Sequence, residues 1–122
     1  MITYQILEED SIVIIEPKGP LSTGDFQQLT ADVDLYLTRA GSLKGILVHA
    51  IAFPGWEDFK GMVSHLRFVR DHHRLIKRVA LASDSMLAEI MPKLVSHFVN
   101  AEVRGFAYED RDAALEWLRE AE

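Results

Sequence analysis

Residues 44–78 read KGILVHAIAFPGWEDFKGMVSHLRFVRDHHRLIKR, and the pattern of apolar residues changes in the middle of this segment. Gly45 to Ala52 form an apolar run that is too short for a helix, which predicts a buried strand. Pro54 and Gly55 interrupt the run and predict a loop. Beyond this loop, apolar residues recur at the spacing of one helix face: Trp56, Phe59, Met62, Val63, Leu66 and Val69. The segment therefore predicts a buried strand that leads through a loop into an amphipathic helix.

The rest of the chain predicts four more strands and three more helices. The strands are expected at residues 2–7, 11–18, 78–82 and 101–106, and the first two form an antiparallel hairpin. The first helix begins near Ser22 or Thr23, which can cap it, and ends before Gly41. Its buried face is expected to hold Phe26, Leu29, Val33 and Leu37, flanked by Tyr36.

Two further helices follow the central one. The segment Ser83–Ser85 predicts a helix start, and Pro92 is expected to kink or split that helix. The last helix begins at Asp110 or Asp112. Its packing residues are expected to be Ala113, Ala114, Leu115, Trp117 and Leu118.

The resulting order of elements, β-β-α-β-α-β-α-β-α, predicts an α/β fold. We expect a single-layer, five-stranded mixed sheet that is mostly parallel, with one antiparallel strand and about four helices. The strand at residues 101–106 is more polar than the others and is expected at an edge of the sheet. Because no linker or internal repeat interrupts the pattern, residues 1–122 are expected to form one domain.

Composition narrows the class of protein. The chain is 48% hydrophobic and 26% charged, which is typical of a globular domain. No apolar run approaches the ~20 residues of a membrane span, and the first residues lack the features of a signal peptide. The chain contains no cysteine, which excludes disulfides and thiolate chemistry. We therefore expect a cytoplasmic protein.

The charge is unevenly distributed along the chain. The net charge is −6, yet six basic residues and one acidic residue lie between Lys60 and Arg78. An acidic body argues against nucleic-acid binding, whereas the basic segment could contact an anionic partner such as the inner membrane. The candidate contact residues are Lys60, Arg67, Arg70 and Arg74. The alternative is that they form an ordinary solvated helix face, which the pattern favours somewhat.

The sequence lacks the motifs of common catalytic sites. It contains no glycine-rich nucleotide-binding loop, no zinc-binding spacing and no nucleophile elbow, so we expect no enzyme activity, cofactor or metal. His49 on the central strand and His97 on a later helix could act as general bases only if the fold brought them together. For each of them, a buried and hydrogen-bonded structural role is the preferred interpretation.

Several groups of residues resemble those of the SpoIIAA-like proteins, which are small bacterial domains with the STAS-type fold of anti-sigma-factor antagonists. That fold is also compared with the lipid-binding CRAL-TRIO fold. The groups are the opening hairpin, Gly45-Ile-Leu-Val-His followed by Trp56-Glu-Asp-Phe, Lys77-Arg-Val-Ala-Leu, His97-Phe98, and Phe106 followed by Ala113, Ala114, Trp117 and Leu118.

The resemblance implies a binding domain with an apolar pocket between helices and sheet. In the sporulation antagonist a phosphorylated serine follows the central strand, but residues 53–58 here contain neither serine nor threonine. Phosphorylation-switched binding is therefore not expected. In open α/β sheets the carboxyl ends of the strands are also where ligands bind.

We expect a non-enzymatic domain that binds an apolar or amphiphilic, lipid-like molecule and contacts membranes peripherally. The candidate ligand-binding residues are Phe53, Trp56, Phe59, Met86, Ile90 and Phe98. Phe53 and Trp56 could equally close the end of the core, and ordinary core packing is favoured for Met86 and Phe98.

The alternative function is a regulatory protein-interaction module of the STAS antagonist type without the phosphorylated serine. In either case we expect at most a weak homodimer. Glu102 and Arg104 on the last strand carry charges that discourage edge-to-edge pairing of sheets.

The membrane contact predicts weak, salt-sensitive binding to anionic vesicles. Each basic residue near an anionic surface contributes ~1 kcal/mol, and an inserted indole adds apolar burial. Trp56→Ala, and Arg67→Glu combined with Arg70→Glu, should both reduce co-sedimentation with phosphatidylglycerol vesicles. High salt should reduce it as well, because charges are screened over ~10 Å at 0.1 M salt. Wild-type protein that stays in the supernatant at low salt would contradict the membrane contact.

Overall fold

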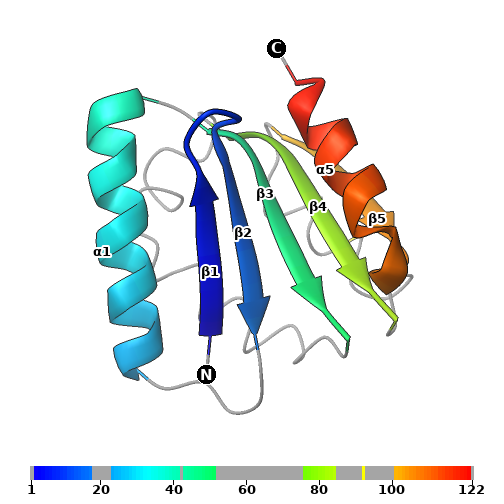
Figure 1. The fold of residues 1–122 in the computed structure, drawn as a ribbon, viewed down its shortest axis with the longest axis horizontal. Coiled ribbons are helices and arrows are strands. Elements are labelled where there is room, and N and C mark those ends of the chain that lie inside the picture. Colours follow the sequence, from blue (N-terminus) through cyan, green and yellow to red (C-terminus); the bar gives the residue numbers. More distant parts are fainter. Residues whose placement is uncertain are drawn as a thin grey trace.

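The structure is a computed structural model that describes residues 2–17, 23–41, 43–51, 76–84, 92 and 101–121. Five strands form one sheet in chain order, β1-β2-β3-β4-β5 (Figure 1). They are β1 (Ile2–Leu7), β2 (Ile12–Pro17), β3 (Leu43–Ala50), β4 (Ile76–Ser83) and β5 (Glu102–Phe106). β1 is antiparallel to β2, and the other neighbours are parallel. The expected mixed sheet, with residues 102–106 at an edge, is confirmed.

Two helices lie within the described residues. They are α1 (Thr23–Ala40) and α5 (Arg111–Arg119), and a 3-10 turn, η2 (Tyr108–Asp110), precedes α5. The helices expected after Trp56 and after Ser85 lie outside the described residues. Neither α1 nor α5, among the described parts of the chain, has the length and apolar composition of a membrane span.

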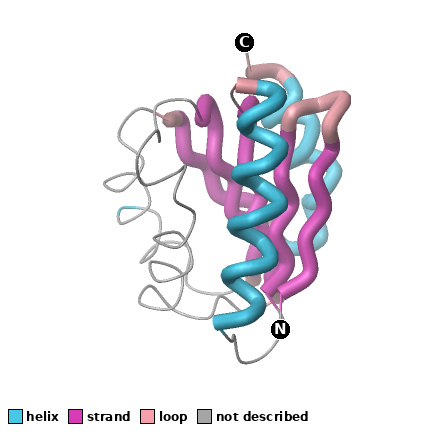
Figure 2. Tube along the Cα trace, turned by 90° about the vertical axis from the view of Figure 1, so that its left-hand side faces the viewer, coloured by secondary structure: helices cyan, strands magenta, loops and turns pink. Residues whose placement is uncertain are grey.

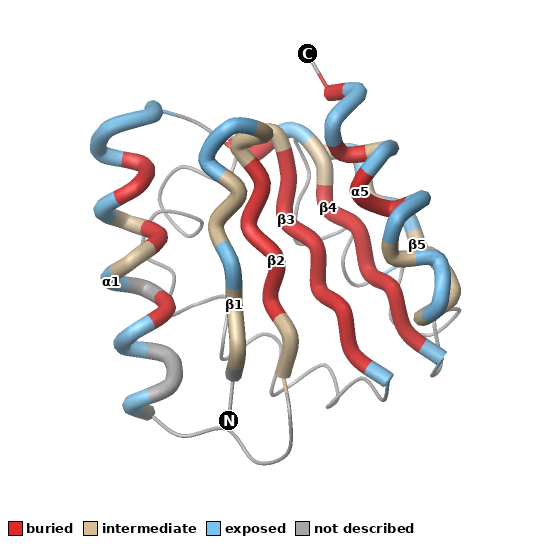
Figure 3. The backbone as a smooth tube through the Cα atoms, viewed as in Figure 1, coloured by how far each residue is buried: buried red, intermediate tan, exposed pale blue. Residues whose placement is uncertain are grey.

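The central strands are apolar on both sides, so helices are needed on both faces of the sheet. Val13 and Ile15 of β2 belong to a cluster on one face, where α1 contributes Leu29, Val33, Tyr36 and Leu37. The intervening residues Ile12 and Ile14 belong to a cluster on the other face, where α5 contributes Ala114, Leu115 and Leu118. Figure 3 shows the resulting burial along most of β2, β3 and β4.

Gly45 allows α5 to approach the sheet closely. A Cβ atom at this position would lie 2.5 Å from Leu118 Cδ2 and 3.2 Å from the carbonyl oxygen of Arg78. Both Gly45 and Leu118 are buried, so a side chain at position 45 would displace the Leu118 side chain from the core. The glycine therefore places α5 directly against β3.

α1 begins and ends where the sequence predicts. Gly41 has φ +85° and its N–H donates to the carbonyl of Leu37 at 2.8 Å, which is the expected helix termination by glycine. Tyr36, expected beside the buried face, is itself buried, and its hydroxyl lies 3.0 Å from Ser11 Oγ.

Two details of the expected elements are wrong. Ser83 is the last residue of β4 and lies opposite Ala50 of β3, so it does not start a helix. Ala113 is exposed, because α5 begins at Arg111 after the 3-10 turn and this start directs Ala114 and Leu115 to the sheet. Asp110 precedes α5 without a capping hydrogen bond from its side chain.

A hydrogen-bonded pair connects β1 to α1, which lies along the β1 side of the sheet (Figure 2). The Tyr4 hydroxyl donates to the Asp32 carboxylate, which also accepts from Gln28 Nε2 at 3.1 Å. These two hydrogen bonds, with Tyr4 first, lower the pKa of Asp32 below its usual value. Burial, and then the bond to Asp32, raises the pKa of Tyr4.

This pair predicts a stability difference that depends on pH. A lowered carboxyl pKa contributes stability above the ordinary carboxyl pKa of about 3.9, and the contribution is lost as pH falls through the folded-state value. Tyr4→Phe should therefore reduce the free energy of unfolding by about 1 kcal/mol near neutral pH. The deficit should shrink as the pH falls further below that ordinary value, because Asp32 is then protonated in the folded protein. Urea unfolding followed by circular dichroism measures both values.

Tyr36→Phe is the matched control for this prediction. It removes a tyrosine hydroxyl whose side-chain partner, Ser11, does not titrate, so its deficit should be similar at both pH values. Equal deficits for Tyr4→Phe at neutral and acidic pH would show that the charge of Asp32 contributes nothing to the bond.

Candidate functional site

The parallel strands β2 to β5 all end at one edge of the sheet, here called the carboxyl edge (Figure 1). Glu16 lies near the end of β2, His49 near the end of β3 and Ser83 at the end of β4. Tyr108 follows β5 by two residues. Polar side chains from four strands or their connections therefore gather where open parallel sheets bind ligands.

His49 is the centre of this group and is only 7% exposed. Its Nε2 lies 3.0 Å from the carbonyl oxygen of Tyr108, and its Nδ1 lies 3.4 Å from Glu16 Oε2. The imidazole also stacks on the Tyr108 ring, with centroids 4.2 Å apart and planes inclined by 7°. The histidine thus joins β2, β3 and the turn after β5.

The partners of the imidazole determine where its hydrogens lie. A carbonyl oxygen only accepts, so Nε2 carries a hydrogen and donates it to Tyr108. Nδ1 can donate to Glu16 only when the ring carries both hydrogens, so that contact is an ion pair only for the imidazolium. The neutral ring keeps the Tyr108 bond and the stacking, and it faces the carboxylate with a lone pair.

Backbone hydrogen bonds fix the residues around this group. The N–H of Tyr108 donates to Asp84 Oδ1 at 3.4 Å. The carbonyl of Ile51, the first residue after β3, accepts from the Asp84 N–H at 3.2 Å and from Ser83 Oγ at 3.5 Å. These hydrogen bonds therefore connect the end of β3 to the end of β4, and the end of β4 to the turn after β5.

The described polar side chains of this group bond to backbone groups of neighbouring elements. Ser83 Oγ donates to the carbonyl of Ile51 at 3.5 Å. Among the described residues, no three histidine, cysteine, aspartate or glutamate side chains are grouped so that they could hold a metal ion. His49 is buried and hydrogen-bonded, as the sequence predicts, and its structural role stays a prediction.

Most of the site residues predicted from the sequence lie outside the described parts of the chain. This holds for His97 and for the candidate ligand-binding and membrane-contact residues, namely Phe53, Trp56, Phe59, Lys60, Arg67, Arg70, Arg74, Met86, Ile90 and Phe98. They remain predictions.

Sequence reasoning overlooked Glu16, Tyr108 and Ile51. The pairing of Ile15 with Val48 places the next residues, Glu16 and His49, side by side at the same edge. A parallel alignment of the two predicted strands could have indicated this contact. No sequence signal indicates Tyr108, because its position depends on how the chain turns after β5.

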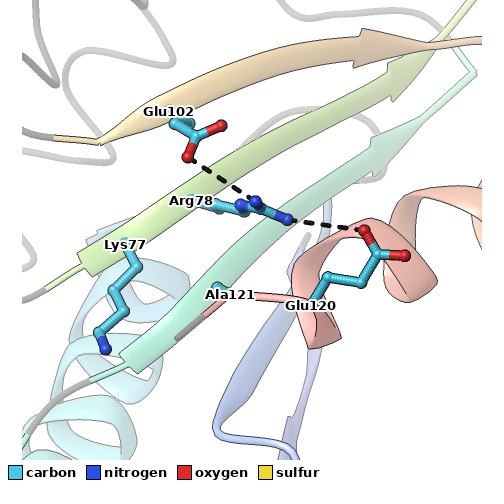
Figure 4. A pocket seen from close by; sticks show the side chains of 5 residues that line it. All are labelled: Lys77, Arg78, Glu102, Glu120 and Ala121. Carbon is cyan, nitrogen blue, oxygen red and sulfur yellow. Dashed lines mark ion pairs between the residues drawn. The ribbon is translucent and has the colours of Figure 1, made fainter.

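A pocket of about 380 Å³ lies at the opposite ends of the strands, next to the last turn of α5 (Figure 4). It is lined by Lys77, Arg78, Glu102, Glu120 and Ala121. The guanidinium of Arg78 donates to the carbonyl of Trp117 and lies 3.7 Å from Glu102 and 4.0 Å from Glu120. It also lies over the Trp117 ring at 4.8 Å. Through these contacts Arg78 of β4 connects to β5 and to the end of α5.

Comparisons with known proteins agree with this architecture. The family model described as SpoIIAA-like matches residues 12–119. The chain is also similar to the crystal structure of an uncharacterized protein with a SpoIIAA-like fold from Shewanella loihica PV-4. That match has 24% sequence identity and a TM-score of 0.57, and it covers 97% of this chain and 92% of the other. No curated protein matches the sequence.

The geometry of His49 predicts how two substitutions should differ. His49→Phe keeps an aromatic ring against Tyr108 but loses the Nε2–H bond, so the free energy of unfolding should fall by about 1–2 kcal/mol. His49→Ala also loses the ring and leaves a cavity, and should cost about 3 kcal/mol or more. Urea unfolding of the three proteins measures the difference. Equal losses for both variants would mean that the stacking contributes no stability.

Proposed function

The chain belongs to the SpoIIAA-like family, and from that premise we propose that it is a non-enzymatic domain that binds an apolar or amphiphilic molecule at the carboxyl edge. Family membership supports a regulatory or binding domain in general. The choice of ligand class rests on the side chains found at this edge.

The observation that carries the proposal is the position of Ile51. Ile51 is 64% exposed, although its carbonyl oxygen accepts hydrogen bonds from the Asp84 N–H and Ser83 Oγ. A large apolar side chain is thus presented to solvent from a fixed backbone, immediately beyond the buried strand β3. The sequence continues with Ala52, Phe53 and, three residues later, Trp56. Apolar residues concentrated after a central parallel strand suit an apolar ligand or the apolar part of a larger one.

The polar groups at the same edge indicate what the other part of the ligand would offer. The carboxylates of Glu16 and Asp84 are hydrogen-bond acceptors, and the side chain of Glu16 is 31% exposed. Asp84 is exposed as well. A ligand with a hydroxyl or amino group next to its apolar part would therefore find both kinds of contact.

The arrangement of His49 supports a non-enzymatic role. A general base needs a free nitrogen within hydrogen-bonding reach of the substrate proton. The Nε2 of His49 is bonded to a backbone carbonyl, Nδ1 faces Glu16, and one face of the ring is covered by Tyr108. The histidine maintains the edge and leaves binding to its neighbours.

Fluorescence titration with N-phenyl-1-naphthylamine, an apolar probe, tests this proposal. Ile51→Gln should weaken probe binding by about tenfold, because it removes an apolar contact of about 1.5 kcal/mol. Leu35→Gln is the matched control: Leu35 is 63% exposed but lies on α1, away from the carboxyl edge. Both variants should fold like the wild type, because both side chains already contact water.

Three outcomes separate the proposal from its alternatives. Weaker binding by Ile51→Gln alone, together with a lipid that co-purifies with the protein in native mass spectrometry, supports the ligand and its position. If both variants bind the probe equally well, the probe does not bind at the carboxyl edge. A wild type that binds no probe but co-purifies with a stable heteropartner would favour the protein-interaction module.

A further inference from the structure

The two edge strands of the sheet, β1 and β5, differ in what lies beside them. β5 pairs with β4 on one side, and no described strand pairs with it on the other. α5 packs against β3 and β4 through Leu118, Ala114 and Leu115, so its packing is centred away from the outer side of β5. At the other edge, α1 lies alongside β1 and is bonded to it through Tyr4 (Figure 2).

β5 carries two opposite charges on one face. Glu102 and Arg104 are two residues apart, so their side chains leave the strand on the same face, with Val103 on the other. Both are exposed, and the Glu102 side chain has 69% of its surface open. Glu102 lies 3.7 Å from Arg78, which is a loose contact. Arg104 lies over the rings of Phe106 and Trp117, at 5.0 Å and 6.0 Å, and has no acidic partner among the described residues.

We propose that β5 pairs antiparallel with β5 of a second copy of this chain, with Val103 opposite Val103. In that register Glu102 of each copy faces Arg104 of the other, so two complementary charge pairs form across a two-fold axis. All four side chains lie on the same face of the joined sheet. The arrangement is independent of the ligand proposed for the carboxyl edge.

The charges also exclude the neighbouring registers. If one strand slides by two residues in one direction, Glu102 lies opposite Glu102 of the other copy. If it slides by two residues in the other direction, Arg104 lies opposite Arg104. Like charges directly opposite each other destabilise a strand pair. A shift that places residues of opposite faces together is excluded by the pleat. Glu102 and Arg104 therefore discourage pairing with most strands and permit one register with an identical strand.

The dimer is weak, because β5 has five residues and each opposite-charge pair adds little. Its formation would place Arg104 of the second copy beside Glu102, which also lines the pocket next to Arg78. The polar pocket would then be bordered by two chains.

Sedimentation velocity over a range of protein concentrations tests the pairing through charge exchange. The wild type should form dimers as concentration rises. Glu102→Arg places arginine opposite arginine at both pairs, and Arg104→Glu places glutamate opposite glutamate. For each variant alone, the dissociation constant of the dimer should rise by about tenfold or more. Because both side chains are exposed, neither substitution should prevent folding, which circular dichroism verifies.

Mixing the two variants provides the decisive measurement. One contributes two basic residues and the other two acidic residues, so the proposed register again has two complementary pairs. The mixture should therefore form a heterodimer more readily than either variant forms a homodimer. A monomeric wild type at all concentrations, unchanged dimerisation of the single variants, or a mixture without heterodimer would each overturn the proposal.

A cross-linking experiment tests the register without changing charge. The chain has no cysteine, so Val103→Cys introduces the only thiol. Directly opposite residues in antiparallel strands have Cα atoms about 4.5–5.5 Å apart, which suits a disulfide. Mild oxidation should link two copies of Val103→Cys and should leave the control Thr38→Cys, exposed on α1, mostly monomeric. Equal cross-linking of both variants would contradict the register.

Discussion

The fold depends on burial of the three central strands on both faces. β2, β3 and β4 carry apolar side chains toward α1 on one face and toward α5 on the other. Such strands cannot be stable with either face in water, because the apolar area lost to solvent would outweigh the hydrogen bonds of the sheet. The position of each helix follows from this requirement. At Gly45 the packing between α5 and the sheet is especially close, because Leu118 fills the space that a side chain at this position would need.

The same burial leaves the polar chemistry to the ends of the strands. Glu16 and His49 are the next-to-last residues of β2 and β3, near the ends of the apolar layers. At the opposite ends, Arg78 connects the sheet to the last turn of α5 and to Glu102. One end of the sheet therefore presents an apolar residue and acceptors to solvent. The other end uses its charges mainly to hold the fold together.

The strands and their order follow from local patterns, whereas contacts between them do not. The alternation of apolar and polar residues predicted both ends of β1 correctly. The apolar run after Lys44 predicted each end of β3 to within two residues. Ser83 was misplaced because the end of β4 is set by pairing with Ala50, a residue in another strand. The contact of His49 with Tyr108 joins residues 59 positions apart and depends on the turn after β5. Periodicity within one segment contains no information about such a contact.

The shortness of α5 has a consequence for how the domain assembles. A helix of nine residues is not stable in water by itself. Its buried residues contact β3 and β4, and its Trp117 carbonyl is bonded by Arg78 of β4. These contacts come from strands of the sheet, so α5 depends on the sheet for its stability. We therefore expect the amide hydrogens of α5 to be protected from exchange only for as long as the sheet beneath it stays closed.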